Sequence, residues 1–157
     1  MMDFIKAEIV IPDDLESICN REIKLIDLET VKGDKFIIYY DSLDCSSCRI
    51  AHLAENNPLY EMADTSGFSV LTIFSPRIDE IEEVKLHLMM ANPPVPVYVD
   101  VNGSFCRHNS LIPSDLRFHK FLIGTHNHPT FVGNPLASER LYGLFQKALI
   151  QSDIINY

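Results

Sequence analysis

The sequence predicts an α/β protein in which helices flank a central mixed β-sheet, with an additional pair of strands at the N-terminus. First, residues 36–41 and 68–74 are short, unbroken apolar runs, which are typical of strands buried on both faces. Second, segments with apolar residues at helical spacing follow both runs, so the two strands are expected to lie parallel in one sheet. Third, two apolar runs around a polar turn near the C-terminus predict a hairpin.

The N-terminal strand pair is predicted from alternation. Residues 7–11 and 22–26 alternate apolar and polar side chains, as short edge strands do. At 157 residues the chain has the length of one domain. We therefore expect a single domain, residues 1–157, with an N-terminal strand extension at residues 1–33 and a core at residues 34–150.

The middle of the chain predicts two strand–helix units and a third strand. After residues 36–41, a helix is expected to begin at a pair of cysteines, and Pro58 opens a second helical segment, since proline is favoured in a first helical turn. After residues 68–74, Ser75 is expected to cap the next helix. The inner face of that helix is formed by Ile81, Val84 and Leu88. Residues 95–101 are predicted to form the third strand.

The C-terminal third predicts the hairpin and a long helix. Residues 121–123 and 130–132 are the hairpin strands, and the turn between them contains Asn127. A helix is then expected to start at Ser138 and Glu139. Its inner face is formed by Leu141, Leu144, Phe145, Ala148 and Leu149.

Two cysteines three positions apart, Cys45 and Cys48, open the helix after the first central strand. Unpaired N–H groups at a helix start favour a thiolate, and one turn of helix brings the second sulfur close enough to close a small disulfide. A C-x-x-C pair alone is shared with zinc knuckles, but a strand before it and a helix after it favour a redox pair. We predict that Cys45 is the more exposed sulfur and Cys48 the more buried one.

Composition and charge exclude several classes of function. The net charge of −9 disfavours nucleic acids and anionic membrane surfaces as partners. No apolar run approaches the length of a membrane span. The first residues have no basic segment followed by an apolar one, so they predict no signal peptide. Four cysteines are too few for a disulfide-stapled scaffold of this size.

The order of these elements, with the cysteine pair directly after the first central strand, resembles the thioredoxin-like superfamily. The N-terminal strand pair resembles its redoxin branch, which includes TlpA-like envelope disulfide reductases. Residues 117–124 and 130–135 look like segments of small thioredoxin-like proteins of bacterial envelopes. The fold hosts reductases, oxidants, peroxidases and inert binding modules, so the fold alone does not define one activity.

The resemblance implies a thioredoxin-like fold over residues 34–150 and a thiol–disulfide oxidoreductase that uses Cys45 and Cys48 without a cofactor. It implies a disulfide-containing protein as substrate or redox partner. It also implies a place in the cell envelope or periplasm, with a signal peptide or lipid anchor trimmed from the chain. The cytoplasm is the alternative.

Two positions depart from the thioredoxin-like pattern, and the first is the place of the cis-proline. Proteins of this fold usually have it just before the first hairpin strand, where this chain has Phe118. Pro129 belongs to the edge of the second hairpin strand, because a hairpin that began there would leave no room for another strand before the last helix. We therefore expect Arg117, Phe118 and His119 to lie over the cysteines. Phe118 would supply apolar cover, and His119 or Arg117 would stabilise the thiolate.

The second departure is Asp44, which stands where a tryptophan usually precedes the dithiol. As a helix N-cap it would accept an N–H of Ser46 or Ser47, a gain of ~1 kcal/mol. Its charge would repel a Cys45 thiolate, which costs on the order of 1 kcal/mol at ~6 Å, and the helix terminus returns about the same. The sequence therefore predicts a modestly acidified Cys45, suited to a reductant or a mild exchanger rather than a strong oxidant.

Two other functions stay open. The cysteines could ligate a metal or an iron–sulfur cluster, with His119 or a second chain completing the shell, although no second C-x-x-C is present. The chain could also be a non-catalytic interaction domain on the same scaffold. A peroxiredoxin is disfavoured, because Ile38 stands where that family has a loop proline. Cys19 and Cys106 are expected to be small buried or incidental residues.

Overall fold

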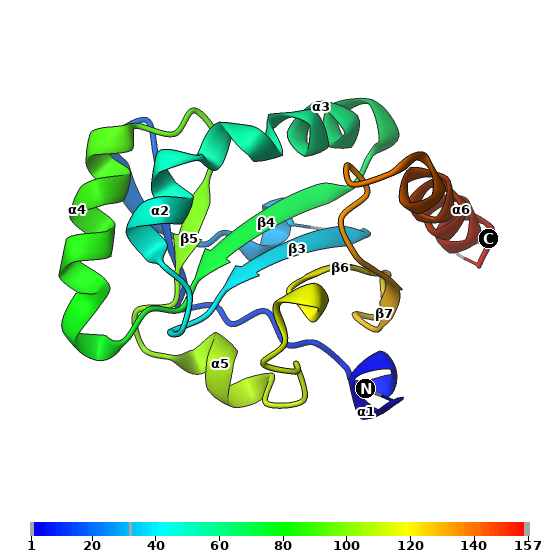
Figure 1. Cartoon of the computed structure of the whole chain (residues 1–157), viewed down its shortest axis with the longest axis horizontal. Coiled ribbons are helices and arrows are strands. Elements are labelled where there is room, and N and C mark those ends of the chain that lie inside the picture. The colour runs from blue at the N-terminus through cyan, green and yellow to red at the C-terminus, as the bar shows by residue number, and fades with distance from the viewer. Residues whose placement is uncertain (1, 32, 156–157) are drawn as a thin grey trace.

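The computed structural model describes residues 2–31 and 33–155. Within them, one mixed sheet in the strand order β2-β1-β5-β4-β3-β6-β7 is covered by helices on both faces (Figure 1). The strands are β1 (Glu16–Cys19), β2 (Glu22–Leu25), β3 (Lys35–Tyr40), β4 (Ser69–Phe74), β5 (Val97–Val99), β6 (Lys120–Ile123) and β7 (Pro129–Val132). The helices are α1 (Met2–Lys6), α2 (Ser46–Ala51), α3 (Asn57–Ser66), α4 (Ile81–Ala91), α5 (Ser104–His108) and α6 (Glu139–Ile155). Within the described ranges, none of these helices is long and apolar enough to cross a membrane.

The two strands at the centre confirm the predicted mixed sheet. β3 pairs in parallel with β4 along its whole length, with Ile38 opposite Thr72, and pairs antiparallel with β6 on its other side. Every residue of β3 is buried. The unbroken apolarity of this segment therefore reflects cover on both faces of the sheet.

An apolar cluster on each face of the sheet holds these layers together. The helices α2, α3, α4 and α6 cover one face of the sheet (Figure 1). On that face, Phe36 packs edge-on against Phe145, with 5.5 Å between the ring centroids. On the face covered by α1 and α5, Tyr39 packs against Phe105 at 5.1 Å. Residues of β3 join the two clusters alternately because successive side chains of a strand point to opposite faces.

The N-terminal strand pair is formed by other residues than predicted. β2 covers most of residues 22–26, but its partner is β1, and residues 7–11 form no strand. The side chain of Asn109 holds the backbone of Val10 instead, since its Oδ1 accepts from Val10 N and its Nδ2 donates to Val10 O, both at 2.8 Å. A side-chain amide thus takes the place of a strand ladder, and the alternation reflects a buried Ile9 between exposed neighbours.

The prediction that Ser75 caps the helix after β4 was wrong. Its hydroxyl donates to Asp100 Oδ2 at 3.0 Å inside the protein. α4 begins only at Ile81, after a 3-10 turn, η3 (Ile78–Glu80). The predicted inner face of α4 is confirmed, because its buried residues are Ile81, Val84 and Leu88.

The C-terminal elements are confirmed in type and corrected in extent. β6 and β7 form the predicted hairpin, and α6 follows it. The strand predicted at residues 95–101 shortens to β5. Pro96, directly before it, lacks the N–H that a ladder bond needs, and residues 101 and 102 form a turn after it. Leu144 is 42% exposed, because it lies about 100° around the helix from the buried Phe145. The helices α1 and α5 were not predicted.

Candidate functional site

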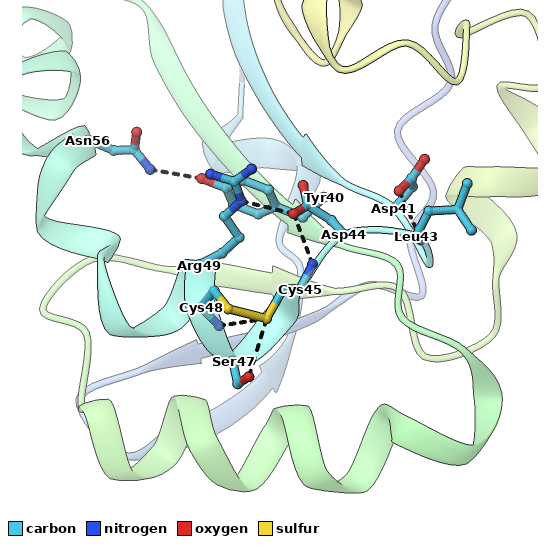
Figure 2. Close-up of polar contacts among 9 residues, drawn as sticks. All are labelled: Tyr40, Asp41, Leu43, Asp44, Cys45, Ser47, Cys48, Arg49 and Asn56. Carbon is cyan, nitrogen blue, oxygen red and sulfur yellow. Dashed lines mark hydrogen bonds and ion pairs between the residues drawn. A yellow bond between two sulfur atoms is a disulfide. The ribbon is translucent and has the colours of Figure 1, made fainter.

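The candidate site is the pair Cys45 and Cys48, which form a disulfide at the start of α2 (Figure 2). Their Cα atoms lie 5.3 Å apart. Cys45 is the N-cap of α2, and its Sγ accepts from Cys48 N at 3.3 Å and lies 3.5 Å from Ser47 Oγ. In the reduced protein, donors in these positions favour a thiolate on Cys45.

The structure does not show the difference in burial that we expected between the two cysteines. Cys48 is exposed, as Cys45 is. The inward face of α2 is formed by Ser46 and Ile50, and Cys48 lies about 200° around the helix from each of them. The order in which the two sulfurs react therefore depends on which thiolate is more stable. That Cys45 reacts first stays a prediction.

Asp44 does not cap α2 in the predicted way. Its Oδ1 accepts from Cys45 N and from Arg49 Nε, both at 2.9 Å, while Cys45 itself occupies the N-cap position. The Asp44 side chain is only 7% exposed. The carboxylate is thus fixed beside Cys45 by one backbone donor and one side-chain donor, and it does not bind the N–H groups of Ser46 or Ser47.

Arg49 is a site residue that the sequence reasoning missed. Its guanidinium forms an ion pair with Asp44 and lies 5.6 Å from the centre of the Tyr40 ring (Figure 2). The hydrogen bond with Asp44 raises the pKa of Arg49. The repulsion between Asp44 and a Cys45 thiolate is therefore weaker than the carboxylate alone would cause. The available signal was a cation directly after Cys48, in the first turns of the predicted helix.

The Tyr40 ring, against which Arg49 lies, is held in place by a second contact. Asn56 Nδ2 donates to the Tyr40 phenol oxygen at 3.3 Å, and both residues are buried. Burial is the main cause that raises the pKa of Tyr40. Because the ring is fixed at one end by the end of β3 and at the other by Asn56, it is a rigid support for the guanidinium (Figure 2).

A cavity of about 420 Å³ is lined in part by Asp44 and Arg49, the residues directly before Cys45 and after Cys48, and we call it the Lys120 cavity. Its polar and aromatic lining includes Tyr40, Asp44, Arg49, Arg117, His119 and Lys120. Two of the three residues predicted to lie over the cysteines, Arg117 and His119, thus share a cavity with Asp44. Asp44 also lines a second cavity, of about 260 Å³, which we call the α4 cavity. That cavity includes Cys45, Ser47, Glu80, Glu83 and His87 in its lining.

The loop before β6 places its three predicted site residues in different surroundings. Arg117 is exposed and pairs with Asp115 at 2.7 Å, which lowers the pKa of Asp115 to about 2. Phe118 packs against the apolar cluster under α1 and α5. Pro129 opens β7, and no cis peptide bond occurs in the described part of the chain. Apolar cover of the cysteines by Phe118 and thiolate stabilisation by Arg117 stay predictions.

His119 is buried and bound to its own loop. Its Nε2 lies 2.7 Å from Pro113 O, and because a carbonyl oxygen only accepts, Nε2 carries the hydrogen. The ring packs 5.1 Å from the ring of Tyr39. Its Nδ1 is buried without a hydrogen-bond partner among the described residues. The stabilisation of a Cys45 thiolate by His119 stays a prediction.

The hypothesis of a metal or iron–sulfur site receives no additional ligands from the structure. Among the residues that the structure describes, no three His, Cys, Asp or Glu side chains form a group that could hold a metal ion. Cys19 and Cys106, which were expected to be small buried or incidental residues, are free thiols, and neither is buried: Cys19 is partly exposed and Cys106 is exposed. The site that the geometry supports is therefore the disulfide itself.

Comparisons with known proteins agree on the fold. No protein-family model matches the sequence, and no curated protein matches it. The structure resembles a protein assigned as thiol:disulfide interchange protein DsbE from Chlorobium tepidum, with a TM-score of 0.52 and 15% identity over 89% of this chain and 99% of that chain. It also resembles the bacterioferritin comigratory protein of Xanthomonas campestris, with a TM-score of 0.53 and 16% identity over 90% and 99% of the two chains. These similarities confirm a thioredoxin-like fold.

Proposed function

We propose that this thioredoxin-like protein is a thiol–disulfide oxidoreductase that works through Cys45 and Cys48. The observation that carries the proposal is the exposed disulfide between them at the start of α2, directly after the buried strand β3. The hydrogen bond from Cys48 N to Cys45 Sγ supports Cys45 as the attacking thiolate. We propose a disulfide-containing protein as its partner.

The exchange consists of two displacements at sulfur. The Cys45 thiolate attacks one sulfur of a partner disulfide, the partner's S–S bond breaks, and its second sulfur leaves as a thiolate. Cys48, after losing its proton to water, attacks Cys45 Sγ and releases the first partner sulfur as a thiolate. The protein ends as the Cys45–Cys48 disulfide, and the partner has gained two electrons and takes two protons from water. A dithiol reductant then reduces the protein by the same steps in reverse.

The surroundings of Cys45 favour a reductant or a mild exchanger. One backbone N–H and one hydroxyl lie at its sulfur, and no Lys, Arg or His side chain among the described residues donates to it. The charge of Asp44 is compensated by Arg49. Because strong oxidants owe their potential to a strongly stabilised thiolate, we expect a potential between about −270 and −180 mV.

Reduction of insulin by dithiothreitol tests the proposal. The wild-type protein should accelerate the precipitation of insulin chains, and Cys45→Ser and Cys48→Ser should each abolish the acceleration. The matched control is Cys106→Ser, which removes an exposed thiol outside the site and should retain activity. A wild-type rate equal to that of dithiothreitol alone, or full activity in Cys45→Ser, would contradict the proposal.

A further inference from the structure

The Lys120 cavity contains a cation without a partner. Lys120, the first residue of β6, is partly buried, and its ammonium forms no hydrogen bond or ion pair with any residue that the structure describes. The other two cations of the cavity are satisfied, since Arg49 is paired with Asp44 and Arg117 with Asp115. An anion that enters the cavity therefore finds one ammonium free to bind it.

The surroundings of Lys120 are unfavourable for its charge in the absence of an anion. Burial, followed by the nearby guanidinium of Arg49, lowers the pKa of Lys120, and the carboxylate of Glu55 opposes this shift more weakly. Unpaired charge in a partly buried position destabilises a fold, and such local conflicts are expected where a protein binds a ligand.

We propose that the Lys120 cavity is a subsite for a carboxylate of the disulfide substrate, namely an Asp or Glu side chain close to the target cystine of a protein partner. The proposal rests on the thiol–disulfide function proposed above. Asp44 lines both the Lys120 cavity and the α4 cavity, which contains Cys45. A segment of the partner protein that lies across Asp44 would therefore extend from the reactive sulfur of Cys45 to the free ammonium of Lys120.

Exposed apolar side chains favour a protein segment over a small disulfide. Leu43 is 84% exposed, Ile78 91% and Leu116 56%. They lie in the segments after β3, after β4 and before β6, which meet at one edge of the sheet because β6 runs antiparallel to β3. Side chains of this size gain burial only against a partner that extends beyond the disulfide itself.

The overall charge of the protein does not oppose this assignment at short range. The net charge is −9, but exposed charges separated by more than about 8 Å are largely screened at physiological salt. A carboxylate in contact with Lys120 is subject mainly to local charges, and those of Asp44 and Asp115 are already paired. Glu55 also acts on Lys120, but its side chain is exposed, so solvent and salt screen its charge. On the opposite flank, Glu80 of the α4 cavity pairs with Arg77 at 2.8 Å and Glu83 lies 4.0 Å from His87, so the described lining of the α4 cavity offers no unpaired cation to a second acidic residue. The acidic residue is therefore expected on one side of the cystine only.

Synthetic peptides with one internal disulfide and a flanking Glu, Gln or Lys test the subsite. The wild-type kcat/KM should be on the order of fivefold higher for the Glu peptide than for the Gln peptide, the ratio that a pair of about 1 kcal/mol supplies. In Lys120→Gln this ratio should fall to about one, and Lys120→Arg should restore it. The matched control is Lys24→Gln on β2, where an exposed lysine pairs with Glu22, and it should keep the wild-type ratio.

The outcomes separate the subsite from the function. Turnover of all peptides at one rate by the wild type would overturn the subsite and leave the function standing. If no peptide is turned over, the proposed function fails. The subsite is then tested by calorimetric binding of a Glu peptide that has serines in place of its cysteines. Binding to the wild type that is lost in Lys120→Gln would support the subsite, and equal binding to both would overturn it. An equal dependence on Lys120 with glutathione disulfide would assign the cavity to a small disulfide and overturn the protein partner.

Discussion

The Asp44 carboxylate, in a side chain only 7% exposed, accepts from Arg49 Nε at 2.9 Å and from Cys45 N at the same distance. The acid and its counter-ion are therefore both fixed beside the sulfur that we propose to attack. Because the two charges have opposite effects on a thiolate, removing one of them leaves the other uncompensated. The pair thus provides a controlled way to change the acidity of Cys45 in both directions.

Arg49→Gln should raise the pKa of the Cys45 thiol, and Asp44→Asn should lower it, each by roughly 0.5 to 1. The first change leaves the Asp44 charge without its partner, and the second leaves the guanidinium of Arg49 without its own. Ultraviolet absorbance of the thiolate, followed against pH, measures both pKa changes in a background in which Cys19 and Cys106 are serine. Arg140→Gln on α6 is the control, and a shift of the same sign in Asp44→Asn and Arg49→Gln would contradict the assignment.

The central strands and the cysteine pair could be predicted because local pattern determines them. A buried parallel strand is apolar throughout, and β3 and β4 appear in the sequence as unbroken apolar runs. The pair Asp44–Arg49 was missed because a spacing of five residues across a helix start is not a standard helical contact. Its geometry depends on Cys45, rather than Asp44, taking the N-cap position.

The N-terminal segment could not be predicted because its backbone partners are far away in the chain. The amide of Asn109 replaces strand pairing at Val10, 99 positions earlier, and no local pattern reports such a contact. The same reason explains Ser75, which has the local features of a cap but donates to the distant Asp100. Local propensity yields to tertiary contacts in both cases.

Limiting alkylation of the reduced protein should label Cys45 before Cys48. The two residues are both exposed, so access does not separate them, but Cys48 N and Ser47 Oγ lie at the sulfur of Cys45. Because the thiolate is the nucleophile, the more stabilised thiolate reacts first near neutral pH. Mass spectrometry of tryptic peptides measures the order, and Cys106 serves as an internal reference for an exposed thiol outside the site. Faster labelling of Cys48 than of Cys45 would reverse their roles.

Tyr40→Phe should lower the free energy of unfolding by roughly 1 to 2 kcal/mol, because it leaves the buried Asn56 Nδ2 without its acceptor. The ring and its contact with Arg49 are retained, so the change isolates the hydroxyl. Urea unfolding followed by circular dichroism measures the difference. Tyr142→Phe removes an exposed hydroxyl from α6 and should change stability by less than about 0.5 kcal/mol. Equal effects of the two changes would show that the Tyr40 hydroxyl contributes nothing specific.

Lys120→Met should stabilise the protein at neutral pH by roughly 1 kcal/mol, since it replaces an unpaired, partly buried ammonium by an apolar side chain. The pKa of Lys120 is lower in the folded protein than its ordinary value of 10.5, mainly through burial. Between the folded pKa and 10.5 the unfolded chain binds more protons, so this contribution to stability rises with pH in that window. The difference in the free energy of unfolding between wild type and Lys120→Met should therefore be largest at a pH below the pKa of Lys120 in the folded protein, and it should shrink as the pH approaches 10.5.

Urea unfolding at neutral pH and near pH ~10 measures the free energy of unfolding of Lys120→Met and of the wild type at each pH. Lys24→Met is the control for an exposed lysine that already has a partner. A stabilised variant that also loses its preference for the Glu peptide would show that the charge of Lys120 is retained for binding at the expense of stability. Destabilisation by Lys120→Met at neutral pH would mean that the ammonium has a stabilising partner in solution, and the cavity would then hold no free cation for a substrate carboxylate.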